Sequence, residues 1–303
     1  MHNNNYLKLI FLISKVLINI YFIGGVILNF SYKLGIDIGS TTIKLVVLDN
    51  DNQVVYKKYM RHLSEIYKSM HDNMILLSDT LKNHKFTCAI TGSAGMGMAN
   101  NLNMPFVQEV IACSKAVKNW IPQTDVAVEL GGEDAKITYF GSAPEQRMNG
   151  VCAGGTGSFI DHMASLLNTD AMGLNELAQK GTQIYTIASR CGVFAKTDVQ
   201  ALLNDGVSKA DIALSILQAV VNQTIGNLAQ GRPLEGNIAF LGGPLYFLTQ
   251  LKERFIKTLK LTDEHIVNVD DGCYFVAMGC ALSDNAIEMT YDELMQRLNN
   301  CSK

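Results

Sequence analysis

Two segments of the sequence place a carboxylate at the end of an apolar strand and follow it with glycine and polar residues. They are Asp37-Ile38-Gly39-Ser40-Thr41-Thr42 and Glu129-Leu130-Gly131-Gly132. A buried carboxylate is costly unless it is paired or bound to a metal ion. Glycine allows close approach of the backbone, and hydroxyls and amides bind phosphate oxygens. The two turns therefore favour a phosphate site, in which Asp37 and Glu129 organise Mg²⁺ and an attacking water.

A third glycine-rich turn, Phe240-Leu241-Gly242-Gly243-Pro244-Leu245, lies where a buried strand leads into a helix. Gly242 and Gly243 would let a flat base and a ribose approach the backbone, so we expect them to border the adenosine of a nucleotide. Each turn alone also has an ordinary structural interpretation, as a polar hairpin or a strand-to-helix connection, because short glycine motifs are weakly specific.

Cys152 and Cys191 differ from the other five cysteines, because each lies in a glycine-containing turn just before a predicted helix, over 156–167 and 196–203 respectively. A thiol near a helix N-terminus has a lowered pKa and is a better metal ligand. A four-iron cluster normally needs four thiolates, which two copies of the chain would supply together. Without their flanking motifs, both residues would be interpreted as small buried cysteines.

The strands and helices predicted around these turns occur in the same order in two successive parts of the chain. The first copy has predicted strands over 34–39, 43–48, 53–60 and 87–91, with helices over 64–82 and 110–120. The second copy has predicted strands over 126–130, 136–140, 238–241 and 266–269, with helices over 208–230 and from residue 274. Strands mixed with helices imply an α/β fold, and two such halves leave a ligand cleft between them.

The predicted domains are an apolar extension over 1–31, a first half over 32–122 and a second half over 123–271 that carries both turn cysteines. A C-terminal helix over 272–300 is expected to pack back onto the first half. The extension contains a 25-residue apolar stretch over 6–30, interrupted by Lys8 and Lys15. Three interpretations stay open for it: a mis-assigned start, a membrane anchor and a signal peptide.

Composition excludes some classes of protein. The 303 residues are 48% hydrophobic and 17% charged, which is typical of a globular chain of one or two domains. The net charge of −3 gives no basic footprint for nucleic acid. Seven scattered cysteines, an odd number, argue against a disulfide framework and favour reduced thiols in the cytoplasm.

The order of the three turns resembles that of the actin/Hsp70/hexokinase superfamily of ATPases. Two segments narrow the resemblance: Asn149-Gly-Val-Cys152-Ala-Gly-Gly-Thr-Gly-Ser-Phe159 and Ser189-Arg-Cys191-Gly-Val-Phe-Ala-Lys-Thr-Asp198. They look like the activator ATPases of 2-hydroxyacyl-CoA dehydratases, which are related to benzoyl-CoA reductase ATPase subunits. The resemblance covers about 32–283. Residues 129–136 and 240–247 look most like the first ATPase module of large fused activases.

The resemblance implies two ribonuclease-H-like halves around an ATP cleft. It also implies a homodimer in which Cys152 and Cys191 of both copies hold one [4Fe–4S] cluster. Such a protein receives an electron from ferredoxin or flavodoxin and passes it, driven by ATP, to a 2-hydroxyacyl-CoA dehydratase or related CoA-ester reductase. The sequence departs from the family at Glu129, where aspartate is common.

Two other functions stay open. A small-molecule kinase of the same superfamily, acting on a sugar-type substrate, would use a carboxylate to deprotonate the substrate hydroxyl and would need no cluster. A non-catalytic actin-like scaffold would form filaments or bind membranes, with negligible ATP turnover.

Overall fold

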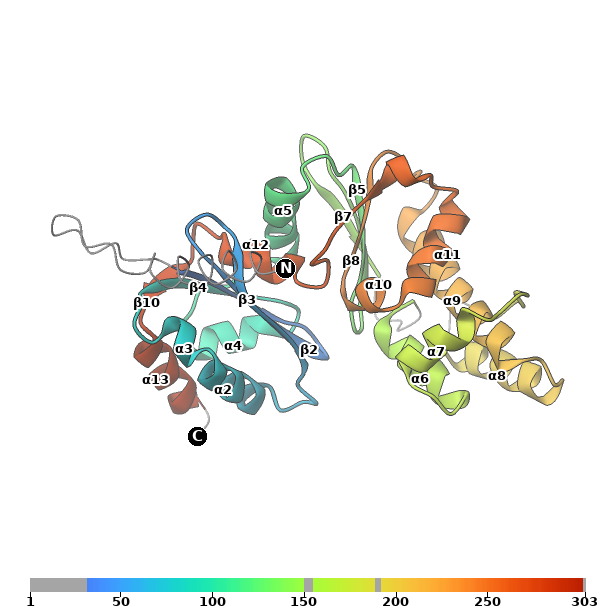
Figure 1. Cartoon of the computed structure of the whole chain (residues 1–303), viewed down its shortest axis with the longest axis horizontal. Helices are drawn as coiled ribbons and strands as arrows, with labels where there is room; N and C mark the ends of the chain where they lie inside the picture. The colour runs from blue at the N-terminus through green and yellow to red at the C-terminus, as the bar shows by residue number, and fades with distance from the viewer. Residues whose placement is uncertain (1–31, 150–154, 189–191, 302–303) are drawn as a thin grey trace, which may run out of the picture. The chain divides into compact units, whose positions relative to one another are not determined.

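The computed structural model describes residues 32–149, 155–188 and 192–301 (Figure 1). The predicted extension over 1–31, Cys152 and Cys191 lie outside the described residues. The described residues belong to one unit that spans Ser31–Lys303.

The first sheet has the strand order β10-β4-β1-β2-β3. Its strands are β1 (Tyr32–Ile38), β2 (Thr42–Leu48), β3 (Val54–Arg61), β4 (Phe86–Thr91) and β10 (Ile287–Met289). β1, β2 and β3 are antiparallel neighbours, and β4 runs parallel to β1. Along β2, Leu45 and Val47 enter one buried cluster, whereas Val46 and Leu48 enter another. Both faces of this strand are therefore covered, which explains its apolar run from Leu45 to Leu48.

The second sheet has the order β7-β6-β5-β8-β9. Its strands are β5 (Val126–Leu130), β6 (Ala135–Tyr139), β7 (Glu145–Met148), β8 (Ile238–Leu241) and β9 (Ile266–Val267). β5 and β6 form an antiparallel hairpin, β7 pairs with β6, and β8 runs parallel to β5. The edge strand β9 runs parallel to β8, whereas β10 of the first sheet runs antiparallel to β4. Because β5 through β8 repeat the arrangement of β1 through β4, the predicted duplicated α/β plan is confirmed.

The helices of the first part cover the first sheet. They are α2 (Ile66–Leu76), α3 (Ser78–Leu81), α4 (Gly95–Asn101), α5 (Glu109–Trp120) and α13 (Tyr291–Cys301). The helix predicted over 64–82 is interrupted at Leu77. Leu294 and Leu298 of α13 enter the same apolar cluster as Leu34 of β1 and the buried methionines of α2.

The helices of the second part are α6 (Gly157–Leu166), α7 (Ala171–Ala178), α8 (Gly192–Asn204), α9 (Lys209–Thr224), α10 (Gly243–Phe247) and α11 (Thr249–Leu259). A π-helical turn, η1 (Ile225–Ala229), continues α9, and a short 3₁₀ turn, η2 (Asp263–His265), precedes β9. Residues 209–229 are long and apolar enough to cross a membrane. They are mostly buried between α7 and α11, so they form a core helix of this fold.

α12 (Phe275–Ala281) is completely buried and links the two sheets. It packs against β1, β2 and α5, in an apolar cluster to which both sheets contribute residues such as Ala89 and Ala239. Residues 272–300, predicted as one C-terminal helix, instead form α12, strand β10 and helix α13. The prediction of a single helix is wrong, because β10 adds a strand to the edge of the first sheet.

Candidate nucleotide site

The two predicted phosphate turns lie against each other. The turn after β1 is closed by the Gly39 amide, which donates to the Thr42 carbonyl. A Cβ placed on Gly132 would lie 2.1 Å from the Thr41 hydroxyl oxygen, so glycine is required for this approach. One cavity of about 30 Å³ is lined by residues of both turns: Asp37, Gly39, Ser40, Thr41, Thr42, Glu129, Gly131 and Gly132.

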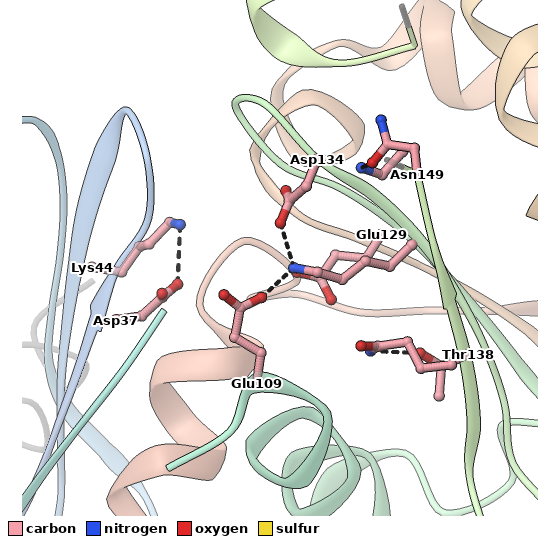
Figure 2. Close-up of polar contacts among 10 residues, drawn as sticks. Asp37, Lys44, Glu109, Glu129, Asp134, Thr138 and Asn149 are labelled. Carbon is pink, nitrogen blue, oxygen red and sulfur yellow. Dashed lines mark hydrogen bonds and ion pairs between the residues drawn. The ribbon is translucent and has the colours of Figure 1, made fainter. Parts of the chain in front are cut away.

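Asp37 lies at the end of β1 and is 5% exposed. Its cross-strand neighbour on β2 is Lys44, whose Nζ lies 3.0 Å from Asp37 Oδ2. Burial opposes the charge of the ammonium, but the attractions of Asp37, Tyr59 and Glu129 together outweigh burial, so the pKa of Lys44 is raised. The pair explains how the carboxylate is tolerated in the core, and it shows that Lys44 does not simply face water (Figure 2).

Lys136 on β6 is the centre of a second group of charges, and its side chain is 4% exposed. Its Nζ lies 2.7 Å from Asp134 Oδ2 and 3.6 Å from Glu129 Oε1, and it also contacts Glu109 Oε2. Figure 2 shows Glu109 and Asp134 directed from different elements toward this ammonium. Glu109 begins α5, so the contact connects the helix to the second sheet.

Burial and charge move the pKa values of this group. Burial raises the pKa of Glu129 to about 7, although Lys136 partly opposes the effect. Burial likewise raises the pKa of Glu109. For Lys136 burial acts against the charge, but the three surrounding carboxylates hold its pKa well above the ordinary value. The ammonium is therefore charged throughout the physiological range.

The sign of the Glu129 shift gives a testable pH dependence. In the folded protein Glu129 keeps its proton up to about pH 7, whereas the unfolded chain releases it near 4.5. This contribution to stability is full below pH 4.5 and is lost as the pH rises through 7. Between pH 5 and 7 it should fall by at most about 1.4 kcal/mol per pH unit.

Urea unfolding of the wild type and of Glu129→Gln at several pH values would isolate this contribution. We expect the unfolding free energy of the wild type to fall, relative to that of the variant, as the pH rises from 5 to 8, because the variant has no carboxyl group to titrate at this position. A difference that is constant from pH 5 to 8 would contradict the assignment.

The carboxylates of the small cavity outnumber the ammonium groups. Among the described residues that line this cavity, the carboxylates of Asp37, Glu109, Glu129 and Asp134 are accompanied by two lysines, Lys44 and Lys136. Among the described residues, no three His, Cys, Asp or Glu side chains converge to hold a metal ion. A Mg²⁺ ion here would therefore take most of its oxygen ligands from nucleotide phosphates and water, as is usual for this ion.

A larger cavity, of about 270 Å³, adjoins the third turn. Its walls are mainly apolar and include Ile160, Met172, Pro244, Phe247 and Leu248, and it shares Thr41, Thr42 and Gly132 with the small cavity. Gly243 lines it, and Gly242 lines a small neighbouring cavity with Asp37 and Glu129. Gly242 has φ +87, and a Cβ there would lie 2.1 Å from the Leu130 carbonyl oxygen, so only glycine fits this turn.

Beside this cavity, side chains on one face of β3 contact residues of the second half. Lys57 pairs with Asp271, the Tyr59 ring lies 5.3 Å from that of Phe247, and Arg61 Nη2 lies 2.9 Å from Asp161 Oδ2 on α6. The residues Lys57, Tyr59 and Arg61 alternate along the strand, as one face of a strand requires. These residues, with Glu109, Asp134 and Lys136, are the site residues that sequence reasoning missed.

The helices that follow the two turn cysteines begin side by side. α6 starts after Thr156, whose hydroxyl accepts from the Phe159 amide, and α8 starts at Gly192. A Cβ on Gly192 would lie 3.9 Å from the Phe159 ring. Val193 and Phe194, in the first turn of α8, are 71% and 65% exposed. The cysteines within the described residues are buried, except Cys301, which is partly exposed.

Comparison with known proteins places this geometry in a family. Relatives include the (R)-2-hydroxyglutaryl-CoA dehydratase activating ATPase of Acidaminococcus fermentans, 29% identical over 70% of this chain and 82% of that protein. The 2-hydroxyisocaproyl-CoA dehydratase activator of Clostridioides difficile is 26% identical over 70% of this chain and 80% of its own length.

Solved structures show the fold. The crystal structure of component A of the A. fermentans dehydratase has a TM-score of 0.69 at 24% identity, over 90% of this chain and all of that one. The ADPNP-bound C. difficile activator also has a TM-score of 0.69, at 23% identity, over 89% of this chain and 97% of that chain. The predicted actin-like architecture of two α/β halves is confirmed. Residues 34–282 match the BadF/BadG/BcrA/BcrD ATPase family, and the chain belongs to this family.

Proposed function

We propose that this protein is an ATP-dependent one-electron donor, which activates a 2-hydroxyacyl-CoA dehydratase or a related CoA-ester reductase. The family and the names of its relatives support an ATPase that activates a dehydratase. The observation that carries the redox part is the adjacency of the starts of α6 and α8, because a cysteine lies shortly before each of them.

In this proposal the nucleotide occupies the two cavities, which share Thr41, Thr42 and Gly132 as lining residues. Gly39, Ser40, Thr41, Thr42, Gly131 and Gly132 bind phosphates, and Gly242 and Gly243 border the adenosine. Asp37 and Glu129 organise Mg²⁺ and the attacking water. The first half (32–122) and the second half (123–271) each supply one phosphate turn, so ATP would hold the halves together.

The surroundings of the turn cysteines suit an iron–sulfur cluster. Cys152 and Cys191 would each lie near a helix N-terminus, where thiolates are stabilised. One chain offers two such thiols, so a [4Fe–4S] cluster would be shared by a homodimer. The exposed Val193 and Phe194 fit an apolar face that a second copy covers. A bound cluster would supply the capacity to accept one electron, from ferredoxin or flavodoxin, and to pass it on.

Contacts of the described residues join the nucleotide site to this region. Ser158 and Asp161 of α6 line the larger cavity, and Arg61 on β3 pairs with Asp161. α6 therefore faces the nucleotide on one side and follows the Cys152 turn at its N-terminus. A change in the separation of the two halves would move α6 relative to β3.

The cavity beside the carboxylates also favours hydrolysis over a kinase reaction. Its volume of about 30 Å³ is enough for one or two waters and is too small for a sugar. Water is the phosphate acceptor that this space admits.

The test is anaerobic iron and sulfide analysis after cluster reconstitution, with ATP turnover measured on the same samples. We expect about four irons per dimer in the wild type, and their loss in Cys152→Ser and in Cys191→Ser. Asp37→Asn serves as the matched variant: it should keep the iron and lose ATP turnover. A wild type that hydrolyses ATP but binds no iron would contradict the redox proposal.

A further inference from the structure

Lys136 and Glu109 take part in a buried ion pair that the proposed roles do not use. The ammonium comes from β6 in the second sheet, and the carboxylate from the first residue of α5. Both side chains line the same small cavity as the two phosphate turns. A buried pair of this kind contributes little to net stability, because the loss of hydration of both charges offsets their attraction. Its position therefore suggests a role in ligand recognition.

The order of the cavities places this pair at one end of the nucleotide site. The larger, apolar cavity contains Pro244 and Phe247 but not Lys136 or Glu109. The small cavity contains Lys136 and Glu109 but not Pro244 or Phe247. The two cavities share the lining residues Thr41, Thr42 and Gly132. A nucleotide with its base in the apolar cavity would place its last phosphate nearest Lys136.

We propose that Lys136 recognises the terminal phosphate of a nucleoside triphosphate, and that Glu109 holds this ammonium while no triphosphate is bound. This inference rests on the proposed nucleotide site and extends it. A lysine ammonium is a compact charge with three donors, so it can exchange a carboxylate oxygen for a phosphate oxygen with little rearrangement. Asp134 and Glu129 remain as its other partners during the exchange.

The exchange would make the site sensitive to the number of phosphates. A diphosphate that ends at the two turns would leave the Lys136–Glu109 contact intact. A triphosphate would release Glu109, and with it the N-terminal end of α5. α5 packs along α12 in the apolar cluster to which both sheets contribute. Release of Glu109 would therefore affect the packing of α5 against α12, the helix that links the two halves.

The experiment compares dissociation constants for ADP and for the non-hydrolysable triphosphate ADPNP, by calorimetry in excess Mg²⁺. In Glu109→Gln, ADPNP should bind about tenfold more tightly relative to ADP than in the wild type, because no contact has to be broken. In Lys136→Gln the ratio should shift about tenfold in the other direction. Glu288→Gln, which disrupts the exposed Lys85–Glu288 pair on the first sheet, is the matched control and should leave the ratio unchanged.

The ratio separates the possible outcomes. Removing a negative charge would tighten binding of both nucleotides, so an equal change for ADP and ADPNP would overturn the exchange. A slower hydrolysis by Glu109→Gln with an unchanged ratio would also overturn it, and would assign Glu109 to the water. If Lys136→Gln does not fold, the Glu109→Gln ratio decides alone. A wild type that binds neither nucleotide would refute the proposed function itself.

Discussion

Lys136→Met should lower the free energy of unfolding by about 3–5 kcal/mol at pH 8. The substitution preserves most of the apolar stem but removes the ammonium that faces Glu109, Glu129 and Asp134. Three carboxylates would then be close together in a site with little water to stabilise their charge. This loss of stability arises because the buried carboxylates are left without a positive partner. It is larger than the net stabilisation that the ion pairs provide in the native protein.

Urea unfolding followed by circular dichroism would measure this change. Lys85→Met is the matched control: its partner Glu288 is exposed and stays hydrated, so a loss of at most about 1 kcal/mol is expected. Lowering the pH to 5.5 should reduce the Lys136→Met loss, because Glu129 with its raised pKa is then protonated. A Lys136→Met loss no larger than that of Lys85→Met would show that the carboxylates are not crowded as described.

The strands that border the site could be read from the sequence, because local features define them. Predicted strands over 126–130 and 238–241 coincide with β5 and β8. Both are short apolar runs, buried by the elements around them, and both end at Gly-Gly turns. The polar strand β7 and the three-residue strand β10 were missed. Each depends on pairing with a neighbouring strand, because β7 is mainly polar and β10 is too short for its alternation to be recognised.

The two ends of the α9 prediction illustrate the same distinction. A helix start at residue 208 was predicted, and the Ser208 hydroxyl caps the helix by accepting from the Asp211 amide. The change from α-helix to a π-helical turn at Ile225 was not predicted, because a π-helical turn has no clear local sequence signal.

Part of the candidate site followed from single turns, and part required the tertiary fold. Asp37 and Glu129 were proposed together because each ends a strand before glycine, and the structure places both on one cavity. Their roles in binding Mg²⁺ and water stay predictions. Glu109 was missed because it is 27 residues from Lys136, and nothing near it in the sequence indicates that α5 brings its first residue to the second sheet.

Gly279→Ala should be the most damaging single methyl addition within the described helices, with a loss of about 3 kcal/mol or more in unfolding free energy. A Cβ on Gly279 would lie 1.7 Å from the Ala112 carbonyl oxygen, so α12 and α5 must separate to accept it. On its other side α12 lies against β1, where a Cβ on Gly35 would be 1.9 Å from the Ala277 carbonyl oxygen. The helix therefore has little freedom to shift away from α5.

Gly97→Ala provides a matched control, because Gly97 also lies within a seven-residue helix, α4, and a Cβ there meets nothing within 4 Å. The same change should stabilise the protein by about 0.4–1 kcal/mol, since alanine reduces the entropy of the unfolded chain. Thermal and urea unfolding of both variants would show whether the unfolding free energy decreases in Gly279→Ala and increases in Gly97→Ala. If both substitutions had the same effect, the close packing of α12 against α5 would be wrong, and with it the structural link from Glu109 to the connection between the halves.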